Sequence, residues 1–172
     1  MKWALIIIGA LVVIVAVVWA IGAAIPREHS ASRIARYKQP PEKIWAAITD
    51  VESFPQWRKD MKGVKRLPDV NGKPAWVETL STGEMPLQVE EWNPPQRLVM
   101  RIVDEKLPFG GTWTYEVVSV EGGATLRLTE NGFVKPALFR FMSKYIFGYT
   151  ATMEQYLKDL GKKFGEDVTP QP

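Results

Sequence analysis

Residues 112–130, with the sequence TWTYEVVSVEGGATLRLTE, decide the fold. Apolar and polar side chains alternate on both sides of Gly122-Gly123, as is typical of strands with one buried face. A two-residue glycine turn would place Tyr115 opposite Glu130, and opposed residues share a face of the sheet. This register predicts an inner face that carries Trp113, Tyr115, Val117, Leu126, Leu128 and Glu130.

Upstream of this hairpin, the chain continues as short strands between turns. Asn71-Gly72 is a strong hairpin signal, and further turns are predicted at residues 81–83 and 93–95. With a first strand at residues 30–38, we expect seven strands, six of them in a consecutive meander. Alternation on the neighbouring strands predicts a second inward-facing apolar set of Leu87, Val89, Leu98, Met100 and Ile102.

Helices are predicted on both sides of the meander. Apolar residues recur at three- and four-residue spacing over residues 136–165, which predicts one long helix with a wide apolar face. Two short helices are expected after the first strand, at residues 41–48 and around 51–57. The long helix is the only element large enough to cover the apolar face of the sheet. The sequence therefore predicts an α+β fold, with a seven-stranded antiparallel sheet wrapped around a C-terminal helix.

The N-terminus is a different kind of segment. Residues 3–25 are uninterruptedly apolar and would span about 34 Å as a helix, enough to cross a bilayer. Trp3 and Trp19 lie towards its two ends, and Pro26 closes it. We expect a single-pass transmembrane anchor at residues 1–26, a folded domain at 27–165 and a polar tail at 166–172. A cleaved signal peptide is the alternative, and the side of the membrane on which the domain lies stays open.

Composition narrows the possible functions. The chain has no cysteine, which excludes disulfides, thiolate metal sites and cysteine nucleophiles. Without Lys2, 21 Lys and Arg face 19 Asp and Glu, too even a balance to predict nucleic-acid binding. No phosphate-binding loop, nucleophile elbow or zinc-binding helix motif occurs, so we expect no cofactor and no metal. The single histidine, His29, is predicted to lie in a solvated linker.

Four stretches carry a family resemblance: PEKIWAAITD at residues 41–50, FPQWR at 54–58, EWNPPQRL at 91–98 and GTWTYE at 111–116. Together they resemble the SRPBCC (START-like) superfamily, specifically the polyketide cyclase/dehydrase-like proteins with a Bet v 1-like helix-grip fold. The resemblance covers about residues 29–165. It implies a cavity for lipids, sterols, polyketides or other apolar small molecules. It transfers no catalytic residues, because these proteins share architecture more than chemistry.

Candidate ligand-binding residues follow from the predicted inner face and from the apolar face of the long helix. Glu130 is the polar member, and it would either anchor a ligand with a raised pKa or reach solvent or a nearby lysine. Aromatic and methionine side chains would supply the apolar contacts. The predicted ligand-binding set is Met100, Trp113, Tyr115, Glu130, Tyr145, Tyr149 and Met153.

Three functions are compatible with these features. The leading hypothesis is a binding module that contacts the lipid bilayer through residues 3–25 and holds a hydrophobic small molecule or lipid. The second is a cyclase- or hydratase-type enzyme that uses Glu130, Asp104 and tyrosines for acid–base chemistry. The third is a domain with a vestigial cavity that binds other proteins. We expect no catalytic set, and the sequence leaves the oligomeric state open.

Overall fold

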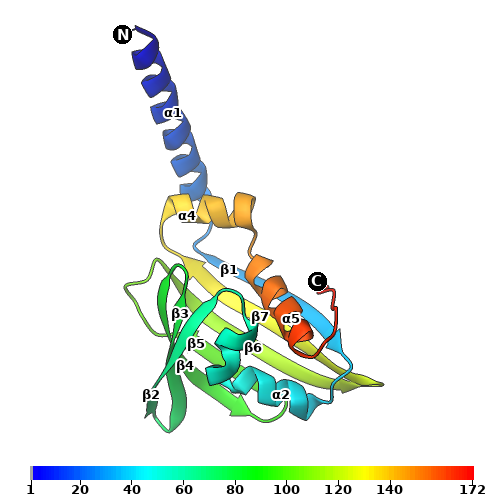
Figure 1. Ribbon diagram of the computed structural model, residues 1–172. Coiled ribbons are helices and arrows are strands. Elements are labelled where there is room, and N and C mark those ends of the chain that lie inside the picture. Colours follow the sequence, from blue (N-terminus) through cyan, green and yellow to red (C-terminus); the bar gives the residue numbers. More distant parts are fainter. Residues whose placement is uncertain (1) are drawn as a thin grey trace.

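A seven-stranded antiparallel sheet forms the body of the protein, and a single helix projects from it at the N-terminus (Figure 1). The structure is a computed structural model and describes residues 2–172. The strand order is β1-β7-β6-β5-β4-β3-β2. Strands β2 to β7 form a six-stranded meander, and β1 extends the sheet by pairing with β7. The strands are β1 (Glu28–Tyr37), β2 (Met61–Val70), β3 (Lys73–Leu80), β4 (Gly83–Asn93), β5 (Arg97–Ile102), β6 (Phe109–Val120) and β7 (Gly123–Val134).

Most of the helices cover the inner face of the sheet (Figure 1). The exceptions are the N-terminal helix and the helix that lies across its base. The helices are α1 (Lys2–Ala24), α2 (Pro41–Thr49), the short turn η1 (Val51–Ser53), α3 (Phe54–Trp57), α4 (Ala137–Met142), the π-helical turn η2 (Ser143–Phe147) and α5 (Ala151–Lys163). Side chains of α2 and α5 join those of the inner sheet face in one apolar core. The predicted α+β helix-grip architecture is confirmed.

The register of the β6–β7 hairpin differs from the prediction by two residues. Glu121 and Gly122 form the turn, because Gly123 already pairs with Val120 as the first residue of β7. Glu130 therefore lies opposite Trp113 rather than Tyr115. A shift of two residues leaves every side chain on its predicted face. The inner residues Tyr115, Val117, Leu126 and Leu128 are all buried, as expected.

The single long helix predicted over residues 136–165 is wrong in its continuity. Helix α4 and turn η2 end at Gly148, which has a φ of 76°, and α5 begins only at Ala151. The two halves have different neighbours: α4 contacts α1, whereas α5 packs over β1 and α3. One straight helix could not meet both, so the chain changes direction between them (Figure 1).

Helix α1 is exposed along nearly its whole length and meets the rest of the protein only at its last turn. There the backbones approach closely: a Cβ on Gly22 would lie 2.1 Å from the carbonyl oxygen of Ala137 in α4. The buried guanidinium of Arg140 donates from Nε to the Gly22 carbonyl oxygen at 2.9 Å. A cation at the carboxyl end of a helix satisfies free carbonyls and complements the helix dipole. Arg140 thus joins α1 to α4.

Candidate functional site

A cavity lies between the helical segment α4–η2–α5 and the ends of β6 and β7. Its volume is about 620 Å³, and we call it the outer cavity. Side chains from β1, β6 and β7 form one wall, and side chains from residues 139–152 form the other. Its lining includes His29, Trp113, Glu130, Phe139, Phe147 and Tyr149.

A second cavity of about 290 Å³ adjoins the first and reaches deeper under the sheet. We call it the inner cavity. Trp113, Glu130 and Thr152 line both cavities, so the two lie side by side. The inner cavity is walled by Met100 and Tyr115 and ends at the charged pair Arg58 and Glu78. A ligand pocket of this size, mostly apolar with a few polar groups, fits a small hydrophobic molecule.

His29 and Glu130 provide the polar group of the outer cavity. The Nε2 atom of His29 lies 3.2 Å from Oε1 of Glu130, and its ring stacks on Tyr149 at a centroid distance of 4.1 Å. Strand pairing produces this contact, because Ala31 of β1 pairs with Glu130 of β7 and His29 lies two residues further along the same face. The Nδ1 atom of His29 is a buried polar atom that no protein group satisfies.

The prediction that His29 lies in a solvated linker is wrong. Strand β1 begins at Glu28, so the alternation that buries Ala35 and Tyr37 continues back to His29. Extending the predicted strand by one residue would have placed His29 on the inner face. The predicted alternatives for Glu130, solvent or a lysine, are replaced by a histidine partner.

Burial raises the pKa of the Glu130 carboxyl, and the neighbouring His29 opposes this rise. A folded-state pKa above the unfolded value means that the folded protein retains the proton where the unfolded chain has lost it. This contribution to stability is present at low pH and is lost as the pH rises through the raised pKa.

We therefore expect Glu130→Gln to flatten the pH dependence of stability. Urea unfolding of the full chain, compared with the variant over about pH 4 to 8, measures the difference. The wild type should lose stability relative to the variant as the pH rises above the ordinary range of a carboxyl group. Parallel curves for the two proteins would show that Glu130 titrates normally.

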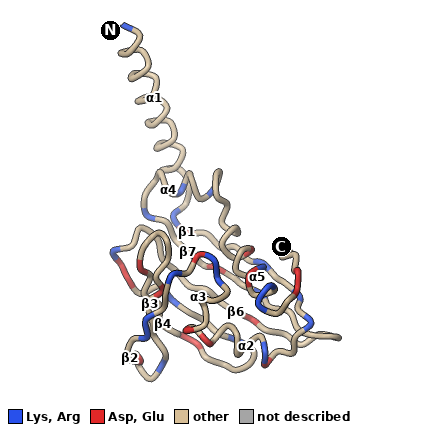
Figure 2. The backbone as a smooth tube through the Cα atoms, viewed as in Figure 1, with Lys and Arg blue, Asp and Glu red and all other residues tan. Residues whose placement is uncertain are grey.

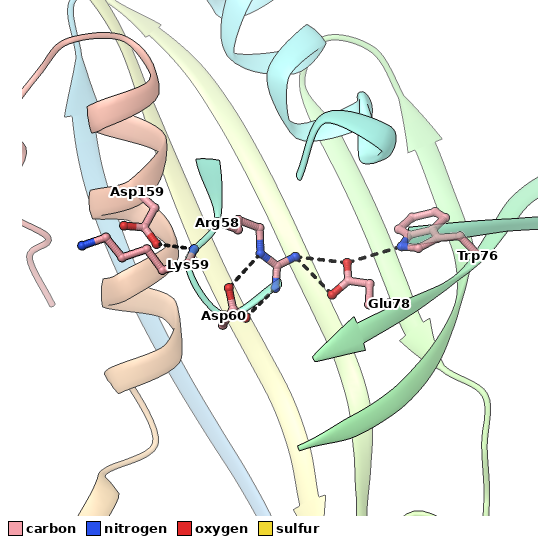
Figure 3. A network of polar contacts seen from close by, with 6 residues as sticks. All are labelled: Arg58, Lys59, Asp60, Trp76, Glu78 and Asp159. Atoms are coloured by element: carbon pink, nitrogen blue, oxygen red, sulfur yellow. Dashed lines mark hydrogen bonds and ion pairs between the residues drawn. The ribbon is translucent and has the colours of Figure 1, made fainter. Parts of the chain in front are cut away.

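A charged network closes the inner end of the site (Figure 3). Nη1 of Arg58 donates to both carboxylate oxygens of Glu78 at 3.1 Å, and Nη2 pairs with Asp60 at 2.9 Å. The indole of Trp76 donates to Glu78 at 3.3 Å, so the carboxylate is held on two sides. Burial by itself would lower the pKa of Arg58, but the neighbouring carboxylates of Glu78 and Asp60 outweigh it. The pKa of Arg58 is therefore raised above its ordinary value, and the guanidinium stays charged. The inner cavity thus ends at a compensated ion pair rather than at an apolar wall.

The structure brings five of the seven predicted ligand-binding residues to the cavities. Trp113 and Glu130 line both, Tyr149 lines the outer cavity, and Met100 and Tyr115 line the inner one.

The other two predicted residues lie elsewhere. Tyr145 is 57% exposed on η2, and Met153 is completely buried in the core under α5. Asp104, considered for acid–base chemistry, lies in the loop before β6 and accepts a hydrogen bond from the Lys106 backbone. Sequence reasoning missed His29, Arg58 and Glu78, and for the Arg58–Glu78 pair the sequence offers no spacing signal.

Comparison with known proteins identifies the family. Residues 29–164 match the family model described as polyketide cyclase/dehydrase and lipid transport. The chain belongs to this family. The SRPBCC resemblance inferred from the sequence motifs is therefore confirmed. Among curated protein sequences, none matches the chain significantly.

Solved structures share the SRPBCC fold at low sequence identity. A START superfamily protein from Mycobacterium smegmatis is 18% identical, with a TM-score of 0.64 over 78% of this chain and 96% of that one. The Zhui aromatase/cyclase from Streptomyces is 10% identical, with a TM-score of 0.67 over 79% and 93% of the two chains. A hypothetical protein from Helicobacter pylori is 14% identical, with a TM-score of 0.66 over 78% and 87%. None of the three alignments covers more than about four fifths of this SRPBCC chain.

Proposed function

We propose that this SRPBCC protein is a membrane-anchored binding module that holds a hydrophobic small molecule or lipid between its sheet and its C-terminal helices. The outer cavity of about 620 Å³ is the observation that carries the proposal, because a volume of this size accommodates a ligand. The apolar body of the ligand would contact Met100, Trp113, Tyr115 and Tyr149. Its polar end would bind at His29 and Glu130, where Nδ1 of His29 has no protein partner.

Helix α1 supports the anchoring half of the proposal. It has 23 residues and is long and apolar enough to cross a membrane, and a signal sequence would pass the same test. Its last turn, however, is bound to the folded domain through Gly22 and Arg140. The small residues Ala20, Gly22 and Ala24 are the plausible cleavage positions of a signal peptide, and cleavage at any of them would cut the chain at or beside this contact. We therefore favour a retained anchor.

Native mass spectrometry of the full chain, released from the membrane in detergent, tests ligand binding. We expect an apolar adduct on the wild type. Thr152 lines both cavities from α5, so Thr152→Trp should fill the site and reduce the adduct by about tenfold, which corresponds to roughly 1.4 kcal/mol of binding free energy. Lys158→Trp, on an exposed position of the same helix, is the matched control and should retain the adduct.

Two results would contradict the proposal. A wild-type protein free of any apolar adduct would argue against ligand binding, as would equal adducts on both tryptophan variants. The same intact masses report on α1: a mature chain that begins after Ala20, Gly22 or Ala24 would overturn the anchor and leave the cavity proposal standing.

Acid–base catalysis of the cyclase or hydratase type is the second candidate, because the His29–Glu130 pair lies in the cavity wall with a raised Glu130 pKa. In this function Glu130 would deliver a proton and His29 would orient it. Glu130→Gln with unchanged ligand adducts but a changed cellular product profile would favour catalysis. An unchanged product profile would leave binding as the function.

A further inference from the structure

The segment Ala137–Phe147, which comprises α4 and η2, exposes an unusual number of large apolar side chains. Tyr145, Ile146 and Phe147 are 57%, 62% and 61% exposed, and Ile146 and Phe147 are the most exposed large apolar residues described outside α1. Leu138 and Phe139 are each 45% exposed. A soluble surface rarely gathers apolar side chains this closely without a partner.

The charge of this segment is one-sided. No Asp or Glu occurs between Glu130 and Glu154, and Figure 2 shows no acidic residue on α4. The exposed charges of that stretch are the cations Lys135 and Lys144, whereas Arg140 is buried against α1. Apolar side chains combined with cations and no acids are typical of segments that lie at an anionic lipid surface. A protein partner would not require the absence of acids.

The contact with α1 determines where this segment lies relative to a membrane. Arg140 binds the Gly22 carbonyl, and the backbone of Ala137 touches Gly22 in the last turn of α1. If α1 crosses a bilayer, its last turn lies at the boundary between hydrocarbon and water. Segment Ala137–Phe147, which runs across the base of α1 in Figure 1, then lies at the same level.

The segment also forms the rim of the outer cavity. Phe139 and Phe147 line the cavity and are at the same time largely exposed, and Phe109 on the opposite side of the rim is 39% exposed. If no lipid covered the cavity mouth, the three phenylalanine rings would be exposed to water, which is unfavourable in free energy. At the membrane surface the same rings would meet acyl chains.

We propose that segment Ala137–Phe147 lies in the interface of the membrane that α1 spans, so that the outer cavity opens directly on lipid. The occupant of this surface is the bilayer itself. The proposal rests on the membrane anchor of the proposed function and narrows its ligand class to a lipid or other apolar molecule dissolved in the bilayer. Such a ligand enters past Phe139 and Phe147 without an aqueous step.

Site-specific quenching tests the proposal, and the absence of native cysteines makes it direct. Single cysteines at Ile146→Cys, Val118→Cys and Val12→Cys are labelled with an environment-sensitive fluorophore. The full chain is reconstituted in vesicles of phosphatidylcholine and phosphatidylglycerol that contain a lipid with a quencher near its headgroup or on its acyl chain. Val118 is a matched control, because it is 57% exposed on β6, away from α1.

We expect the label at position 146 to shift to the blue and to be quenched by the lipid quencher near the headgroup, whereas the label at 118 stays unquenched. The label at position 12 should be quenched by the quencher on the acyl chain.

Quenching at position 12, with the label at 146 behaving like the one at 118, would overturn the interfacial placement of segment Ala137–Phe147 and leave the anchor intact. A label at 146 that is shielded from aqueous iodide but not quenched by lipid would indicate a protein partner and would also overturn the proposal. No quenching at position 12 would remove the anchor and this inference together, while the adducts seen by native mass spectrometry would report on the cavity independently.

Discussion

Replacing Glu78 with leucine is expected to lower the free energy of unfolding by about 3 kcal/mol. This is the lower end of the cost of removing one member of a buried ion pair, because Asp60 still pairs with Arg58. Glu78 is 2% exposed and Arg58 is 8% exposed, so bulk water would compensate poorly for the lost carboxylate. The Trp76 indole would lose its acceptor in the same substitution. Urea unfolding of the full chain in detergent, followed by tryptophan fluorescence, measures the change.

Two further variants separate the ion pair from simple loss of packing. Asp60→Asn removes the more exposed partner of Arg58 and should cost about 1 kcal/mol or less. The double variant Arg58→Met with Glu78→Leu removes both charges and should recover much of the stability lost by Glu78→Leu. A double variant no more stable than Glu78→Leu would show that the pair contributes through packing alone.

The second large effect is expected at Gly111 in β6, where an added side chain would meet the backbone of β7. Gly111 has a φ of 133°, and a Cβ there would lie 2.2 Å from the Asn131 carbonyl oxygen. Gly111→Ala should therefore cost about 1–3 kcal/mol in backbone strain, since the colliding atom belongs to the backbone and cannot turn aside. Thermal unfolding of the full chain measures this loss.

Gly63 in β2 supplies the control, because a Cβ there meets nothing within 4 Å. Gly63→Ala should change stability little. Gly111 pairs with Gly132, two residues before the pair Trp113 and Glu130. Separation of the strands at Gly111 should therefore also weaken ligand binding in the outer cavity. Equal stability of the two alanine variants would show that β6 and β7 relax without strain.

The sheet was predictable from the sequence because its signals are local. Alternation placed Tyr115 and Leu126 on the inner face correctly. It did so even though the turn was predicted at residues 122 and 123, one position later than the observed turn at 121 and 122. Face assignment depends only on whether a residue number is odd or even, so a slip of two residues does not affect it. The pairing of Glu130 does depend on the slip, and that pairing decides which side chain lies opposite the carboxylate.

The site was less predictable because it depends on contacts between distant segments. The His29–Glu130 contact joins residues 101 positions apart, and the Arg58–Glu78 pair joins an extended loop to a strand. Neither leaves a spacing pattern in the chain. Tyr145 was placed with the ligand-binding residues because its apolar periodicity continues that of α5. The break at Gly148 turns that part of the chain towards α1 instead.

Only Ile25, Pro26 and Arg27 lie between the end of α1 and the start of β1, and Arg140 clamps the last turn of α1 to α4. With α1 in a bilayer, the domain is held rigidly at the membrane surface, because these three residues are too short to act as a flexible linker. Its reach is then limited to its own dimensions. Such a protein could not carry a ligand through water to another membrane. It would transfer a ligand only to the leaflet it contacts or to another protein in the same membrane.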